Sequence, residues 1–133
     1  MLRQLARLTR PVEAAGDRAL ALAVYADATG RAVPAAEAGP EGVACVDDAA
    51  RALVLFGHLW EVTRLPLLRA WAEGLLEFVL FMQDADGRFV NFIADWSGRR
   101  NERGPTSVAG GGFWHARGLR ALTTADLVLG DVR

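Results

Sequence analysis

Residues 43–60 read Val43-Ala44-Cys45-Val46-Asp47-Asp48-Ala49-Ala50-Arg51-Ala52-Leu53-Val54-Leu55-Phe56-Gly57-His58-Leu59-Trp60. When this segment is wound at 3.6 residues per turn from Asp47, apolar side chains point in nearly every direction from the helix axis. A helix that is apolar on all sides is normally buried. The sequence therefore predicts a central helix that other elements cover over most of its surface.

The few polar residues of this segment form one seam. Asp47, Arg51 and His58 fall on a line at positions i, i+4 and i+11, and Asp48 lies beside the first of them. One Asp is explained as a helix N-cap, which contributes about 1 kcal/mol, and acids suit the positive end of the helix dipole. A further charge on a buried helix needs a partner or a wet cavity. A structural salt bridge and a functional pocket both remain open.

The composition is that of a folded domain. The 133 residues fit a single domain, residues 1–133, with 52% hydrophobic and 23% charged residues. The net charge of -1 gives no strong electrostatic field, so we expect no nucleic-acid partner. All 15 basic residues are Arg, and the absence of Lys excludes a Schiff-base lysine and a P-loop lysine.

Cysteine content and hydropathy bear on the cellular compartment. Cys45 is the only cysteine, so the chain forms no internal disulfide and no all-cysteine metal site. The neighbouring Asp47 and Asp48 raise the pKa of this thiol and make it a poor nucleophile. Acidic residues interrupt the N-terminal segment, and no apolar run has the length of a membrane-spanning helix. We expect a soluble, cytoplasmic protein without a membrane partner.

The remaining pattern predicts an all-α fold of antiparallel helical hairpins with one short extended segment. Leu65-Pro66 separates the central helix from an amphipathic one, because Pro favours the first turn of a helix. These two helices are expected to form a hairpin, the first inner and the second outer. The predicted elements are helix 2–8, helix 12–29, loop 31–42, helix 67–83, extended segment 88–96, loop 97–112, and a last helix from 113 to 125 or 129.

Side chains that could bind a substrate or take part in catalysis gather at predicted helix starts and in the extended segment. Carboxylates beside aromatic rings suit sugars, because acids bind hydroxyl groups or exchange protons and ring faces stack on C–H surfaces. Cleavage of a glycosidic bond needs two carboxylates across that bond, so Asp47 or Asp48 requires a second acid such as Asp95 or Glu102. Arg51 is expected to orient the catalytic acid. The candidate substrate-binding residues are Asn91, Asp95, Trp96, Trp114, His115 and Arg117.

Metal and cofactor chemistry find little support in the sequence. Neither His58 nor His115 belongs to a pair of His and acid at i, i+4, which is the spacing that grips zinc on a helix. We therefore expect no metal site and no cofactor. His58 is interpreted as a core or interface histidine.

Three motifs resemble a known family when they are taken in chain order. They are Cys45-Val46-Asp47-Asp48-Ala49-Ala50-Arg51-Ala52, Gly87-Arg88-Phe89-Val90-Asn91-Phe92 and Phe113-Trp114-His115-Ala116-Arg117-Gly118-Leu119-Arg120-Ala121-Leu122. They are similar to a bacterial helical domain of the six-hairpin glycosidase type, which occurs alone or attached to glycosyltransferases. Ala49 stands where this family has Asn, and Thr106-Ser107 stand where it has acids.

The resemblance implies an alpha/alpha toroid, a carbohydrate substrate, and Asp47, Asp48, Arg51 and Asn91 on the cavity side. A complete toroid has twelve helices, whereas this sequence predicts four or five, so it resembles a shortened portion. Two functions follow as expectations. The first is a carbohydrate-active protein, hydrolase-like, that uses Asp47 and Asp48 for acid/base work. The second is a non-catalytic helical interaction module that forms a homodimer or docks on a partner protein completing the helical ring.

Overall fold

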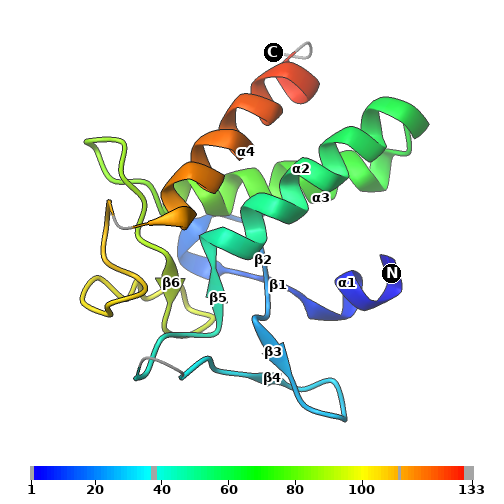
Figure 1. Cartoon of the computed structure of the whole chain (residues 1–133). Coiled ribbons are helices and arrows are strands. Elements are labelled where there is room, and N and C mark those ends of the chain that lie inside the picture. Colours follow the sequence, from blue (N-terminus) through cyan, green and yellow to red (C-terminus); the bar gives the residue numbers. More distant parts are fainter. Residues whose placement is uncertain (1, 37–38, 111, 131–133) are drawn as a thin grey trace.

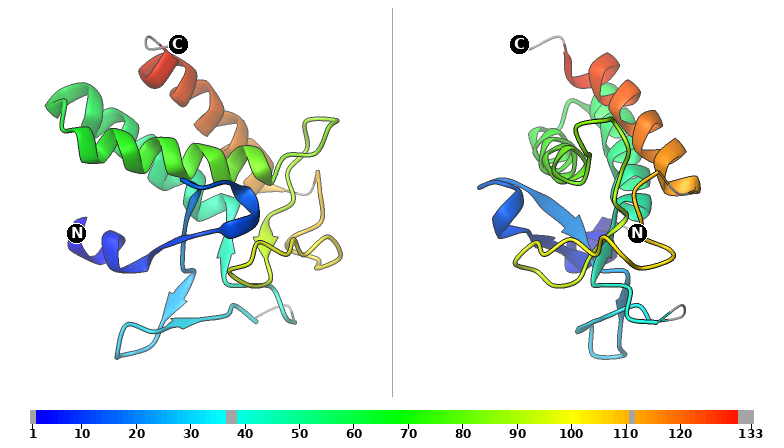
Figure 2. Two further views of the ribbon diagram at one scale, coloured as in Figure 1. Left: turned by 180° about the vertical axis from the view of Figure 1, so that it is seen from behind. Right: turned by 90° about the vertical axis from the view of Figure 1, so that its left-hand side faces the viewer.

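A computed structural model describes residues 2–36, 39–110 and 112–130 of the chain (Figure 1). Three long helices form one layer: α2 (Val46–Thr63), α3 (Pro66–Phe81) and α4 (Phe113–Leu129). A short helix, α1 (Leu2–Leu8), precedes them. Helix α2 lies between α3 and α4 and packs against both, as the two views of Figure 2 show. The predicted central helix is thus confirmed.

Local sequence explains how α2 and α3 form a hairpin. Helix α2 ends at Arg64, which takes the left-handed conformation (φ 55°) and donates its backbone N–H to the carbonyl of Trp60. Leu65 is extended (φ -74°, ψ 116°), as expected of a residue before Pro. Pro66 then opens α3, where its missing N–H costs no helical hydrogen bond. The predicted antiparallel hairpin is confirmed.

The core lies where the three helices meet. Phe56 of α2 and Phe78 of α3 are buried, and the ring of Phe56 lies 5.0 Å from that of Trp71. Helix α4 approaches closely at Gly118, where a Cβ atom would lie 2.8 Å from Cε2 of Phe89. Any larger residue at this position would separate α4 from the loop that carries Phe89.

The other half of the molecule consists of loops with three two-stranded antiparallel sheets. In the first, β1 (Thr9–Pro11) pairs with β2 (Leu20–Leu22), with Thr9 opposite Leu22, and the 3₁₀ turn η1 (Glu13–Ala15) lies between them. In the second, β3 (Tyr25–Ala26) pairs with β4 (Ala32–Val33). In the third, β5 (Ala44–Cys45) pairs with β6 (Phe92–Ile93), with Ala44 opposite Ile93.

The prediction of an all-α fold is therefore wrong, and so is the alpha/alpha toroid. The described residues contain one helical hairpin and a third long helix beside it, not a ring of hairpins. The predicted helix 12–29 is replaced by η1, β2 and β3. Within this segment, β2 pairs with β1 and packs against α3. Gly74 of α3 permits this contact, because a Cβ atom there would lie 2.6 Å from the carbonyl oxygen of Arg18.

Several other predicted elements are confirmed. The short helix 2–8, the helix after Pro66 and the last helix reaching Leu129 are all present. The extended segment 88–96 is only partly regular, because its strand is limited to Phe92–Ile93. Loop 31–42 contains β4, while residues 37–38 of this loop and residue 111 of loop 97–112 lie outside the described residues. Over the described ranges, no helix is both long and apolar enough to cross a bilayer.

Candidate functional site

The start of α2 brings together five of the residues that the sequence singled out. Arg117 of α4 donates to Asp47 Oδ1, and Arg51 lies 3.7 Å from the other oxygen of that carboxylate. Arg51 also donates to Asp48 Oδ1 at 2.5 Å. Asn91 accepts the backbone N–H of Asp47 through its Oδ1 at 3.2 Å. We call these five residues the α2 cluster.

Both carboxylates of the α2 cluster are engaged by arginine. The side chain of Asp47 is only 14% exposed and lies between two guanidinium groups, while Asp48 shares Arg51 with it. The hydrogen bond to Asp48 raises the pKa of Arg51, so this cation stays charged. A catalytic carboxyl group must reach the reacting atoms of a substrate, whereas both of these carboxylates are taken up by arginine ion pairs. Of the two interpretations left open by the sequence, this geometry favours the structural salt bridge.

Asn91 connects the α2 cluster to the long loop before α4. Its Nδ2 donates to the carbonyl of Thr106 at 2.9 Å, and its backbone N–H donates to the carbonyl of Ser107. The Ser107 hydroxyl in turn accepts the backbone N–H of Phe92 at 2.8 Å. Asn91 is 2% exposed. Its polar groups are used to hold the loop against the start of α2.

Trp114 and His115 point into the protein. Trp114 is 5% exposed, and its indole N–H donates to the carbonyl of Phe89 at 3.1 Å. The His115 ring lies 5.7 Å from the ring of Phe89. The indole of Trp114 therefore has no open face on which a sugar ring could stack, and Phe113 is the exposed aromatic residue at this end of α4.

Asp95 and Trp96 lie apart from the α2 cluster. Asp95 accepts hydrogen bonds from the hydroxyl of Ser97 and from Arg99, and these bonds hold its pKa below the usual range, with the Ser97 hydroxyl contributing most. Trp96 lines a shallow depression with Pro11 and Glu13. These two predicted residues are therefore not brought to the start of α2.

Cys45 sits directly before α2 and is buried. Burial raises the pKa of its thiol well above the ordinary value, and the charges of Asp48 and Asp47 raise it further. The predicted direction is confirmed, although burial rather than the acids is the main cause. The thiol is therefore kept neutral and unreactive.

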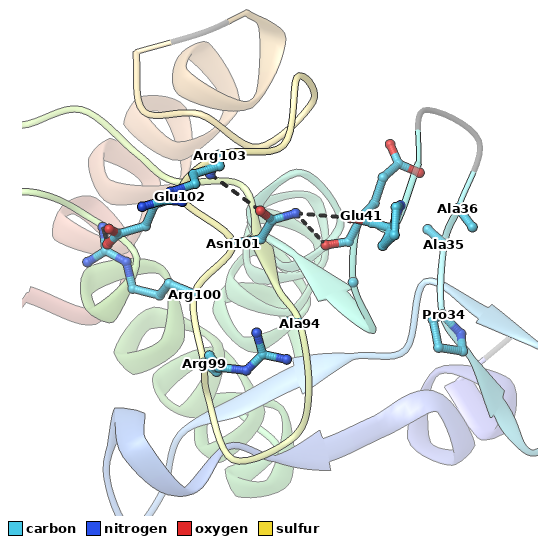
Figure 3. A pocket seen from close by; sticks show the side chains of 12 residues that line it. Pro34, Ala35, Ala36, Glu41, Ala94, Arg99, Arg100, Asn101, Glu102 and Arg103 are labelled. Atoms are coloured by element: carbon cyan, nitrogen blue, oxygen red, sulfur yellow. Dashed lines mark hydrogen bonds and ion pairs between the residues drawn. The ribbon is translucent and has the colours of Figure 1, made fainter.

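A cavity of about 540 Å³ lies between residues 34–36 and 40–42 on one side and residues 94 and 99–103 on the other (Figure 3). We call it the loop pocket. Pro34, Ala35, Pro40 and Ala94 supply apolar wall. The polar residues that line it are Glu41, Arg99, Arg100, Asn101, Glu102 and Arg103.

Asn101 fixes the two sides of the loop pocket to each other. Its Nδ2 donates to the carbonyls of Pro40 at 3.3 Å and Glu41 at 2.9 Å, and its Oδ1 accepts the backbone N–H of Gly104 at 3.0 Å. Glu41 is 8% exposed and accepts a hydrogen bond from Thr106 Oγ1. Figure 3 shows Asn101 reaching across to the backbone beside Glu41, so the pocket is preformed.

The charges around the loop pocket are only partly balanced. Arg100 forms ion pairs with Asp84 and with Glu102, the latter at 3.5 Å, and Arg99 pairs with Asp95 at 3.1 Å. Arg103 has no ion pair within the described part of the chain. Figure 3 shows the Arg99 guanidinium directed between the loop and the segment of Pro34. The lining therefore contains both guanidinium and carboxylate groups, and Arg100 and Glu102 pair with each other.

Sequence reasoning identified the α2 cluster but missed most of the loop pocket. The sequence indicates Glu102 as a possible second carboxylate but contains no local signal for Glu41 or Asn101. The available signal was the length of loop 97–112, because long loops in compact domains are usually functional or mobile. Among the described residues there is no group of three or more His, Cys, Asp or Glu side chains that could hold a metal ion.

Comparisons with known proteins add no family to this description. The chain matches no protein-family model, and a search of curated proteins gives no match either.

Proposed function

We propose that this protein binds a carbohydrate in the loop pocket and does not cleave it with Asp47 and Asp48. The observation that carries the proposal is the cavity whose two walls Asn101 holds together, with apolar Pro and Ala side chains on one wall and the Arg99 guanidinium directed between the walls (Figure 3). Small-molecule sites commonly have volumes of about 300–1,000 Å³ with a few placed polar groups. The three motifs that resemble a carbohydrate-active family agree with a sugar as the ligand class, although none of them lines the loop pocket.

The chemistry of the lining suits a sugar. Hydroxyl groups both donate and accept hydrogen bonds, so they can use Arg99 and Arg103 as donors and the Glu102 carboxylate as an acceptor. The Pro and Ala side chains offer apolar surface to the C–H groups of a pyranose ring. The backbone that carries these groups is held in place by the hydrogen bonds of Asn101, which limits the backbone entropy lost on binding.

The arrangement of acids argues for binding rather than hydrolysis. Glycoside cleavage requires carboxyl groups about 5–5.5 Å apart for retention or about 6.5–9.5 Å apart for inversion, on both sides of the scissile bond. Asp47 and Asp48 are adjacent in the chain and both are ion-paired with arginine. The groove beside them is lined by Arg51, Arg117 and Arg120 and contains no carboxylate.

Binding can be tested by NMR titration of the full chain with a panel of neutral monosaccharides and disaccharides. We expect shifts of the backbone amides of Ala94 and Asn101 for at least one sugar. Arg103→Ala should weaken its binding roughly tenfold, the equivalent of about 1.4 kcal/mol. Arg3→Ala is the matched control, because Arg3 is an exposed arginine on α1, and it should leave the affinity unchanged.

Two results would overturn the proposal. The proposal allows a Kd no weaker than about 1 mM, so the titration reaches about 10 mM sugar. If no amide shifts at that concentration, carbohydrate binding in the loop pocket is excluded. Release of reducing sugar from an oligosaccharide by the wild-type chain, lost in Asp48→Asn with the fold intact, would restore a catalytic role for the α2 cluster.

A further inference from the structure

One face of α2 is left uncovered by the residues that the structure describes. Arg51, His58, Glu61 and Val62 are exposed on it, and Val54 and Leu55 are half-buried. Val62 is 83% exposed. We call these six residues the open face. Figure 1 shows α2 in front of α3, with α4 on one side of it and α1 on the other.

Two grooves border the open face. A groove of about 450 Å³ separates it from α4 and is lined by Val54, Leu55 and His58 together with Arg117 and Arg120. A second groove, of about 390 Å³, lies toward α1 and is lined mainly by apolar side chains, including Leu5 and Leu8. The open face is thus a ridge between two grooves, and a ridge of the same shape from another helix can enter either groove.

The charges of the open face change sign along its length. At its beginning, the three guanidinium groups of Arg51, Arg117 and Arg120 exceed the two carboxylates of Asp47 and Asp48, which leaves one positive charge. Toward its end Glu61 carries a negative charge and lies 3.0 Å from His58 Nδ1. Arg64 forms no ion pair with Glu61 among the described residues, and its guanidinium lies over the Trp60 ring at 5.2 Å.

We propose that the open face binds a second copy of this chain, with the two α2 helices antiparallel. A two-fold axis beside residue 56 places each residue of one helix opposite the residue equally far from 56 on the other helix. The numbers of two facing residues therefore add up to 112. Arg51 then faces Glu61 of the second copy, and the same contact is repeated on the other side of the axis. The two charges lie about 15 Å apart along each helix, at 1.5 Å per residue.

The same axis also pairs the apolar parts of the face. Val54 lies opposite His58 of the second copy, and the two Leu55 side chains meet near the axis. The exposed Val62 lies opposite Ala50, which lines the groove toward α4. Each ridge therefore enters a groove of the other copy, and Glu61 enters the group of three arginines. Such self-complementarity is what an isologous two-fold contact requires.

This surface lies apart from the loop pocket, so the proposal is independent of carbohydrate binding. Sedimentation equilibrium tests it on the full chain. We expect a mass of about twice 14.3 kDa at high concentration and a concentration-dependent return to monomer. Glu61→Arg and Arg120→Glu should each raise the dimer Kd at least tenfold, because Glu61 of one copy enters the group of Arg51, Arg117 and Arg120 of the other.

Asp17→Arg is the matched charge-reversal control, because Asp17 is exposed and precedes Arg18, which pairs with Glu73 and Glu77 on α3. It should leave the Kd unchanged. A mass of 14.3 kDa at every concentration would overturn the proposal. So would a dimer that tolerates both single charge reversals, because its contact must then lie elsewhere.

A cross-link tests the position of the axis separately. Leu55→Cys places a thiol beside its own copy across the axis, so mild oxidation should give a covalent dimer. Leu119→Cys is the control, because Leu119 is 46% exposed on α4 and lies outside both grooves. Equal cross-linking of the two variants would overturn the antiparallel arrangement.

Discussion

The helical layer and the loop half of this protein are held together by different forces. In the helical layer, α2, α3 and α4 are joined by apolar contact, and residues such as Phe56, Leu75 and Phe78 are buried. In the loop half, single polar side chains bind backbone groups that are distant in sequence. Asn91 and Asn101 are the clearest examples.

This difference decides how each region responds to substitution. Apolar contact is nondirectional, so the helical layer depends on the volume and burial of its side chains. A hydrogen bond to a buried amide is directional, and a loop held by a few of them depends on the identity of each donor and acceptor. The structure of the loop pocket therefore depends on a few specific side chains, while the packing of the helices depends on many.

The largest effect is expected from Phe56→Ala in the helical layer. Phe56 is 1% exposed and packs on the ring of Trp71, so truncation leaves a cavity at the centre of the layer. The free energy of unfolding should fall by about 3–5 kcal/mol. Urea denaturation followed by circular dichroism measures it. Val62→Ala, at a position 83% exposed, should change it by less than about 0.5 kcal/mol. Equal effects of the two would refute the packing described for α2.

In the loop half, Ser107→Ala is expected to have the next largest effect. Ser107 is 0% exposed and its hydroxyl accepts the N–H of Phe92, which would be left without a partner. The free energy of unfolding should fall by about 1–3 kcal/mol, and the Phe92 amide should exchange its hydrogen faster. Ser97→Ala removes an exposed hydroxyl and should be nearly neutral. If amide exchange at Phe92 is unchanged, the loop is held by other contacts.

The same contrast explains which features the sequence could predict. Helices α2, α3 and α4 were recognised because apolar spacing, Pro66 and the acids near Asp47 are local signals. The segment 12–29 was misread as a helix because its strand, β2, exists through pairing with β1 and contact with α3. Neither partner is visible in the local pattern of the segment.

The candidate site shows the same limit. Asp47, Arg51 and Arg117 were predicted and lie together, because two helix starts place them there. Asn101 could not be predicted in its role, because its acceptors belong to Pro40 and Glu41, about sixty residues earlier in the chain. Such contacts depend on where the loops lie after the helices have packed.

Cys45 lies between the two regions, directly before α2, and its thiol should affect the free energy of unfolding only at high pH. Burial raises the pKa of its thiol above the unfolded value of about 8.5, so the folded state favours the neutral form. This contribution to stability is fully present below that pH and is lost as the pH rises through the folded pKa. The free energy of unfolding should fall more steeply above pH ~8.5 in the wild type than in Cys45→Ala. Parallel pH profiles would show that the thiol is accessible to water.

The smallest effect concerns Asp95, at an exposed turn of the loop half. The Ser97 hydroxyl, with help from Arg99, holds the pKa of this carboxyl below the ordinary value of about 3.9. Ser97→Ala should raise that pKa, which carbon NMR of the side-chain carboxyl measures directly. Asp27 is the internal control. Hydrogen bonds from Thr29 and Arg31 lower its pKa, and this pKa should not change in the variant.

Any stabilisation from Asp95 is present above the unfolded pKa and is lost as the pH falls through the folded one. Because this motif spans only residues 95–99, it forms without the packing that positions Asn101. A pKa of Asp95 that stays low in Ser97→Ala would mean that distant groups hold the carboxylate. The conformation of this turn would then depend on contacts that are distant in sequence, as the loop pocket does, and not on residues 95–99 alone.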